Sequence, residues 1–163
     1  MNISKQEQIK TFLLGANNLC DELLVNNFQE LQITKYTYSS REAVEELGLD
    51  DDLIHHLVED YVAQILKSIY IFTEQLLELH SAQEAKQSLD YIPLRELAHK
   101  NLGVARNLRI RDGEKLLYEM MIKDDLAYLE LCIKALQACA IKLKPDCAYN
   151  TVTMIQIKKN IVK

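Results

Sequence analysis

A run of apolar residues with helical spacing, from Leu53 to Leu79, constrains the fold of this chain more than any other feature. Its apolar positions recur at steps of three and four residues, as they do on one face of an α-helix. They are Leu53, Ile54, Leu57, Val58, Tyr61, Val62, Ile65, Leu66, Ile69, Phe72, Leu76 and Leu79. Three aspartates at positions 50–52 precede the run and suit the positive N-terminal end of a helix. The pattern predicts one helix from about Asp50 to about His80, roughly 45 Å long.

The rest of the chain has the same helical character. Only 4 Gly and 2 Pro occur among its 163 residues, so few positions interrupt a helix. Apolar residues at helical spacing predict further helices over residues 3–31, 39–47, 93–108, 112–121 and 124–143, with a connector over residues 32–38. Residues 147–163 leave two alternatives, a final helix or an ordered tail. We therefore expect an all-α protein, and its length suits one domain.

Residues 94–110 contain the histidine with the most suggestive chemical setting. On a helix, His99, Gly103 and Arg106 fall on one stripe together with Arg95. Three leucines of the segment, Leu94, Leu97 and Leu108, fall mostly on the other side. A glycine costs roughly 1 kcal/mol in a helix interior, so Gly103 needs a reason. The reason we infer is that it lets another surface approach the imidazole of His99.

This segment resembles the core motif of histidine-containing phosphotransfer (HPt) domains. That motif runs His-x-Leu-Lys-Gly and continues to a Leu, and often a Gly, five and six residues later. His99, Gly103 and Leu108 match the spacing. Three positions depart, with Asn101, Leu102 and Arg109 in place of the Leu, the Lys and the later Gly of the motif. The order and length of the predicted helices extend the resemblance from about residue 36 to residue 144.

The resemblance implies an HPt-like antiparallel four-helix bundle over residues 36–145. It leaves an N-terminal helical extension over residues 1–35 and a C-terminal extension over residues 146–163. We expect the three parts to form a single globular unit. The N-terminal helix could extend the bundle, or it could form a homodimer or bind a partner.

The resemblance also implies a role in a two-component phosphorelay. His99 would carry a phosphoryl group to or from an aspartate of a receiver domain. An imidazole side chain ordinarily has a pKa of about 6.5, so at neutral pH a ring nitrogen is available as a nucleophile. The receiver would supply Mg²⁺, and the chain itself is expected to need no cofactor. Its partners would be a response-regulator receiver domain, a sensor histidine kinase, or both.

Five further residues are candidates for contact with the phosphoryl group or the partner: Arg95, Lys100, Leu102, Gly103 and Arg106. Residues 94–115 hold six basic and three acidic side chains, an excess of three positive charges that suits a phosphoryl group or an acidic partner. Arg106 is the best substitute for the lysine of the motif, because its guanidinium group fits phosphate oxygens. Leu102 would instead belong to a docking surface.

Two alternatives remain open. The chain could be an HPt-like adaptor that binds a receiver or kinase without being phosphorylated. It could also be an unrelated helical-bundle interaction protein in which His99 is an ordinary surface residue. With only 4 Gly there is no glycine-rich phosphate loop, so we expect a phosphoryl carrier with no kinase or ATP-binding segment rather than a true enzyme.

Charge and composition argue against several other classes. The net charge of -5 provides no basic field for nucleic acid. No apolar run approaches the roughly 18 residues of a membrane span. The four cysteines lack the close spacing of zinc ligands, and the N-terminus lacks a signal-like pattern. We therefore expect no metal site, no membrane association and a cytoplasmic location with reduced thiols.

Overall fold

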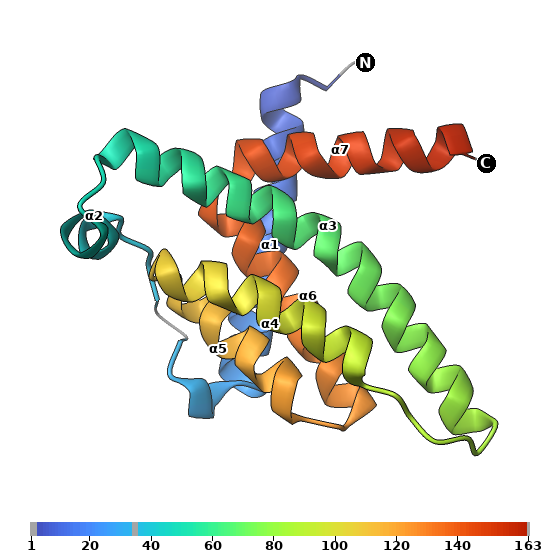
Figure 1. Ribbon diagram of the computed structural model, residues 1–163. Helices are drawn as coiled ribbons and strands as arrows, with labels where there is room; N and C mark the ends of the chain where they lie inside the picture. The colour runs from blue at the N-terminus through green and yellow to red at the C-terminus, as the bar shows by residue number, and fades with distance from the viewer. Residues whose placement is uncertain (1–2, 34–35, 163) are drawn as a thin grey trace.

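The computed structural model describes residues 3–33 and 36–162, which contain seven α-helices and one short 3-10 helix (Figure 1). These are α1 (Lys5–Asn26), η1 (Gln29–Leu31), α2 (Arg41–Leu47), α3 (Asp51–Glu84), α4 (Ile92–Asn107), α5 (Arg111–Ile122), α6 (Leu126–Leu143) and α7 (Pro145–Val162). The described residues include no β-strand, so the all-α prediction is confirmed. Residues 34 and 35 of the predicted connector, and residues 1–2 and 163 of the predicted extensions, lie outside the described residues.

Helices α3 to α6 pack as a ring of four. Helix α3 packs against α4 and α6, and α5 packs against the same two neighbours. Short connections at residues 108–110 and 123–125 reverse the chain between α4, α5 and α6, so these helices run antiparallel (Figure 1). Their apolar faces meet in one core, whose largest fully buried side chains include Phe72, Ile65, Leu116 and Leu136. None of the described helices combines the length and the apolar character that a membrane crossing requires.

Helix α3 begins and ends close to its predicted limits. The carboxylate of Asp50 accepts a hydrogen bond of 2.8 Å from the backbone N–H of Leu53, which makes Asp50 the N-cap. The helix continues to Glu84, one turn beyond the prediction. The preceding helix, α2, ends at Gly48, whose φ of 68° is the left-handed conformation that glycine adopts readily.

Helix α5 starts one residue before the predicted limit, residue 112, and its N-cap is Ile110. Helix α5 begins at Arg111, so Asp112 lies inside its first turn, where its carboxylate accepts a 2.7 Å bond from the N–H of Gly113. The turn before α5 is fixed from outside by tyrosines of the connector. The hydroxyl of Tyr38 donates to the carbonyl of Leu108 at 2.9 Å.

The terminal helices pack on this ring. Helix α1 ends at Asn26, earlier than the predicted Leu31, and lies along α6. The chain then reverses at Gln32, which has a φ of 57°. The sequence pattern of residues 147–163 fits either a helix or a tail, and residues 145–162 form a helix, α7, which contacts α1, α3 and α6. Its C-terminal half extends past the bundle in Figure 1, and Met154, Ile157 and Ile161 of this half are exposed.

Candidate functional site

Helix α4 presents His99 to solvent. Its buried positions follow the helical period and are Leu94, Ala98, Asn101, Leu102 and Ala105. His99 lies on the opposite, exposed side, as the sequence predicts. Pro93 stands in the first turn, where its missing N–H costs no hydrogen bond. The packed face of α4 thus fixes the helix, and the imidazole projects from its free face.

Gly103 leaves open space one turn after His99. A Cβ atom built at Gly103 would meet no heavy atom within 4 Å beyond its own helix. Packing inside the chain therefore does not require a glycine there. The exposed residues around it are Val104 and Arg106, which continue the free face of α4. A partner surface could approach the helix backbone at this point, next to the imidazole.

Leu102 does not belong to this exposed face. Its side chain is only 3 % exposed and is part of the core. The prediction that Leu102 contacts a docking partner is therefore wrong. The physical reason is the phase of the helix, because Leu102 follows Ala98 by four residues and both face the bundle. The neighbouring Asn101 is also buried, and its side-chain amide donates hydrogen bonds to Ser68 Oγ at 2.9 Å and to the carbonyl of Leu97 at 3.0 Å.

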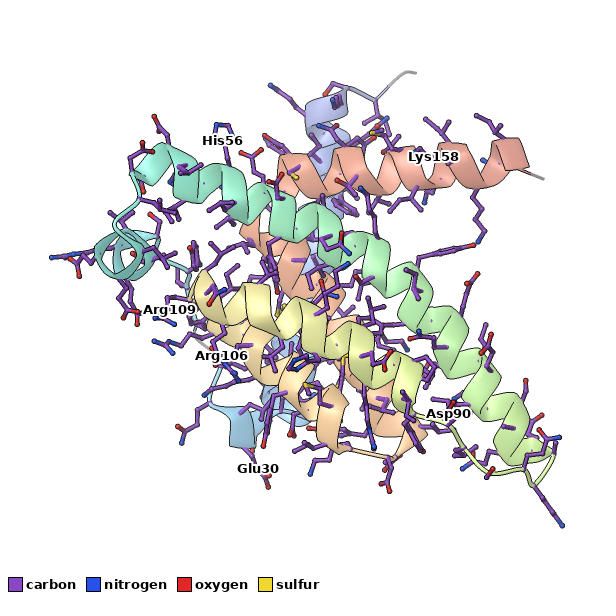
Figure 2. The ribbon with its side chains drawn as sticks, in the orientation of Figure 1. Glu30, His56, Asp90, Arg106, Arg109 and Lys158 are labelled. Atoms are coloured by element: carbon purple, nitrogen blue, oxygen red, sulfur yellow. The ribbon has the colours of Figure 1, made fainter. Side chains whose placement is uncertain are left out.

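The positive charge near α4 is largely paired with acidic side chains. Figure 2 shows Arg106 and Arg109 at the C-terminal end of α4. Arg106 Nε lies 3.2 Å from Glu114 Oε1 of α5. Arg109 pairs with Glu46 of α2. Counting the acids of α2 with this segment lowers the local excess of positive charge that the sequence suggested.

Two further basic side chains of the segment are also engaged. Arg111 Nη2 lies 2.7 Å from Glu42 Oε1. Lys115 Nζ donates a 2.6 Å hydrogen bond to the carbonyl of Leu31. These contacts fasten α5 to α2 and to η1. They leave Lys100 and Arg95 as the predicted basic residues nearest to His99 along α4 that have no carboxylate partner among the described residues.

Arg95 and Lys100 differ in their surroundings. The guanidinium carbon of Arg95 lies 4.9 Å from the centre of the Tyr91 ring, a cation–π contact. Arg95 Nε is buried and makes no hydrogen bond within the described part of the chain. Lys100 is fully on the exposed side. Lys100 is therefore the predicted cation whose ammonium group can move most freely toward a group bound at His99.

The turn between α4 and α5 has the geometry of a Schellman motif. Arg109 has a φ of 62°, in the left-handed region. The N–H of Ile110 bonds to the carbonyl of Ala105 at 2.9 Å, and the N–H of Arg109 bonds to the carbonyl of Arg106 at 3.2 Å. The hydroxyl of Tyr36 donates to the carbonyl of Arg109 at 2.9 Å, and burial raises the pKa of Tyr36 to about 12. A position that ordinarily favours glycine is thus occupied by arginine.

An apolar groove lies between α2, α3 and the C-terminal half of α4, which contributes Val104, the residue after Gly103. Its volume is about 560 Å³. The lining consists of Leu47, Leu57, Asp60, Tyr61, Gln64, Val104, Asn107 and Leu108. Val104 and Leu47 are each about 40 % exposed, so the groove is open on one side. It offers an apolar contact surface on the free side of the helix that holds His99.

The histidines at the start of α3 do not belong to a metal site within the described residues. His55 Nε2 lies 3.2 Å from Asp51 Oδ2, and its Nδ1 lies 3.1 Å from Lys144 Nζ. Within residues 3–33 and 36–162, no group of three or more His, Cys, Asp or Glu side chains could hold a metal ion.

No protein-family model, curated protein or solved structure matches this chain. The assignment of a function therefore depends on the residues and geometry described above.

The structure brings some predicted residues together and separates others. His99, Lys100, Gly103 and Arg106 share the exposed face of α4. Leu102 is not part of this exposed face, because its side chain is buried in the core. The sequence pattern did not indicate the acidic partners, Glu42 and Glu46, because they lie more than 60 residues earlier. The contact between the thiols of Cys20 and Cys139 was also missed, since these two residues are 119 positions apart.

Proposed function

We propose that this chain is an HPt-like phosphocarrier that exchanges a phosphoryl group between His99 and a receiver-domain aspartate. The main supporting observation is the exposed imidazole of His99 with open space at Gly103 one turn later. This combination gives a receiver domain the room it needs to place its aspartyl phosphate against the ring. The ring of four helices, α3 to α6, agrees with the antiparallel bundle that the resemblance implies.

The left-handed Arg109 supplies separate support. The HPt motif often has glycine at this position, and glycine is the residue that the left-handed conformation favours. The backbone of this chain adopts that conformation, although its residue is arginine. The turn after α4 therefore has the left-handed backbone conformation at the position where the HPt motif often has glycine.

The proposed transfer needs only a nucleophile, alignment and some positive charge. A neutral ring nitrogen of His99 attacks the phosphorus of an aspartyl phosphate on the receiver. An N–P bond forms, the P–O bond to the aspartate breaks, and the electron pair of that bond leaves on the aspartate carboxylate. Mg²⁺ in the receiver neutralises charge on the phosphoryl oxygens. Lys100 is the side chain of this chain that would assist from the exposed face of α4.

Phosphate loading tests this proposal. The purified chain is incubated with a small phosphoramidate donor, and separately with phosphorylated receivers, and its intact mass is measured. We expect one acid-labile phosphoryl adduct that is lost in His99→Ala. The matched control is His56→Ala, which removes an exposed histidine from α3 (Figure 2). An adduct that persists in His99→Ala, or that is lost equally in His56→Ala, would contradict the assignment of His99.

A second candidate function is an adaptor that binds a receiver or kinase without being phosphorylated. Two observations favour it. The lysine position of the motif is occupied by Leu102, which is buried, and most basic side chains nearby are already paired. The apolar groove beside Gly103 is a surface on which a partner could bind without any transfer.

Binding measurements separate the two functions. Under the adaptor function, Gly103→Glu weakens receiver binding because the added side chain projects into the docking space. His99→Ala binds the receiver normally, and the wild type forms no phosphoryl adduct. Under the carrier function, the wild type forms the adduct and Gly103→Glu loses both binding and transfer. Unchanged binding by Gly103→Glu would count against docking on this face in either case.

A further inference from the structure

The thiols of Cys20 and Cys139 lie against each other in the core. Their Sγ atoms are 3.5 Å apart, although the two residues are separated by 119 positions in the sequence. Cys20 belongs to α1 and Cys139 belongs to α6, and these two helices pack along one another. Both sulfurs are held in place by this packing, since Cys20 is 0 % and Cys139 is 6 % exposed. The contact is therefore a property of the helix pair.

A small oxidant can reach one member of the pair. Cys139 lines a pocket of about 330 Å³ that opens between α3, α5, α6 and the connector. The pocket also contains Lys142 and the buried carboxylate of Asp112. A water molecule occupies about 30 Å³ of liquid volume, so the pocket admits a molecule of similar size such as hydrogen peroxide.

We propose that Cys20 and Cys139 form a redox-active pair that a peroxide oxidises to an intramolecular disulfide joining α1 to α6. The sulfurs need to approach by only about 1.5 Å to reach the length of an S–S bond. No other pair of thiols in the described residues is in contact. This inference does not depend on the proposed function of His99.

The chemistry takes place in two steps. The sulfur of Cys139 attacks one oxygen of hydrogen peroxide while its proton passes to the thiolate of Cys20, which forms a sulfenic acid on Cys139 and releases hydroxide that is protonated to water. The sulfur of Cys20 then attacks the sulfur of the sulfenic acid, forming the disulfide and releasing a second water. The two thiols lose two electrons and two protons, and one peroxide is reduced to two waters.

The environment of the pair helps the first ionisation. The hydrogen bond between the two thiols lowers the pKa of Cys20, and the charge of Lys142 also lowers it. The same contact, burial and the charge of Asp112 raise the pKa of Cys139, so the thiolate of the pair is on Cys20 and the proton of Cys139 passes to it only as Cys139, which faces the pocket, attacks the peroxide. Cys132 lies on the same helix without such a partner, and burial raises its pKa to about 12. Cys132 is therefore the matched control for a buried thiol of α6.

The test is titration of the folded chain with hydrogen peroxide, followed by intact mass measurement and peptide mapping without reductant. We expect a loss of two hydrogens, about 2 Da, reversed by dithiothreitol, with peptides of Cys20 and Cys139 joined. Cys20→Ser and Cys139→Ser should each abolish the link, whereas Cys132→Ser should retain it. The oxidised chain should also unfold at a temperature higher by about 5 °C or more, because the link closes a long loop.

Two results would overturn the proposal. One is that the Cys20–Cys139 link fails to form at peroxide concentrations that already oxidise the half-exposed Cys147. The other is that the link forms only in denaturant, which would show that the folded helices hold the sulfurs out of reach. A variant that fails to fold is recognised by its loss of helical circular dichroism. In that case Cys20→Ala and Cys139→Ala, which keep the core apolar, replace the serine variants.

Discussion

Asn101 of α4 donates a hydrogen bond of 2.9 Å to the hydroxyl oxygen of Ser68 of α3, inside the packed interface of the two helices. Both side chains are buried, at 1 % and 0 % exposure, and each has one further polar neighbour, the Leu97 carbonyl for Asn101 and the side-chain amide of Gln64 for Ser68. A buried polar group without a partner costs about 1–3 kcal/mol, so each of these residues depends on the other.

This pair predicts a non-additive mutant cycle. Ser68→Ala should lower the free energy of unfolding by about 1–2 kcal/mol, because one N–H of Asn101 loses its acceptor. Asn101→Leu in the same background should recover most of that loss, since both polar groups are then gone. Urea denaturation of the wild type, both single variants and the double variant measures the coupling. Additive effects would show that the bond contributes nothing to stability.

Two glycines predict opposite responses to alanine. Gly103→Ala should stabilise the chain by about 0.5–1 kcal/mol, because the added Cβ meets open space in a helix interior. Gly113→Ala should destabilise it, because the added Cβ would overlap the hydroxyl of the buried Tyr61. Thermal unfolding of the two variants gives the comparison. A destabilising Gly103→Ala would contradict the open space around this helical position.

The sequence was sufficient to predict most of the helices, for reasons that are local. Apolar spacing fixes which face of a helix is buried, and capping residues act on neighbouring N–H groups. The aspartates predicted at the start of α3 accordingly include its N-cap, Asp50. The same spacing predicted that His99 is exposed. The weaker pattern of α7 did not decide between a helix and a tail, because its described side chains are mostly half-buried or exposed.

The two errors have different causes, one local and one between distant segments. Leu102 was assigned to the surface from its place in the motif, whereas its helical phase relative to Ala98 buries it. The positive character around His99 was overestimated because Glu42 and Glu46 of α2 are brought to it only by folding. Helical phase alone indicates the burial of Leu102, whereas no local pattern indicates the ion pairs of Glu42 and Glu46.

Restoring the lysine of the HPt motif should be costly in this chain. Leu102→Lys replaces a side chain that is 3 % exposed, so it loses apolar burial and desolvates an ammonium group. We expect a loss of about 2 kcal/mol or more in the free energy of unfolding. Leu102→Met, which keeps an apolar side chain of similar volume, should cost less than about 1.5 kcal/mol. Equal stability of the Lys variant and the wild type in urea would show that position 102 can reach solvent.

Asp112 predicts a pH-dependent stability. Burial raises the pKa of this carboxyl above its ordinary value. The folded state therefore binds the proton more tightly than the unfolded state, and the contribution of Asp112 to stability falls as pH rises from the ordinary pKa through the raised one. Asp112→Asn removes this effect and keeps an oxygen that can accept from the N–H of Gly113.

The test is the difference in unfolding free energy between Asp112→Asn and the wild type as a function of pH. That difference should shift in favour of the variant as the pH rises above about 4, the ordinary pKa of an aspartate side chain. A surface control is Asp52→Asn, at an exposed position in the first turn of α3. A difference for Asp112→Asn that does not change with pH would show that the folded chain binds this proton no more tightly than the unfolded chain.

Arg109 gives a prediction that isolates backbone strain from ion pairing. Its φ of 62° costs an L-residue about 1 kcal/mol relative to glycine, and its side chain pairs with Glu46 and bonds to the carbonyl of Arg106. Arg109→Gly and Arg109→Ala both lose these side-chain contacts, but only glycine relieves the backbone. The Gly variant should therefore be more stable than the Ala variant by about 1 kcal/mol in urea denaturation. If the Ala variant is as stable as the Gly variant, the left-handed turn after the histidine helix is not strained, and its agreement with the glycine of the HPt motif loses its weight.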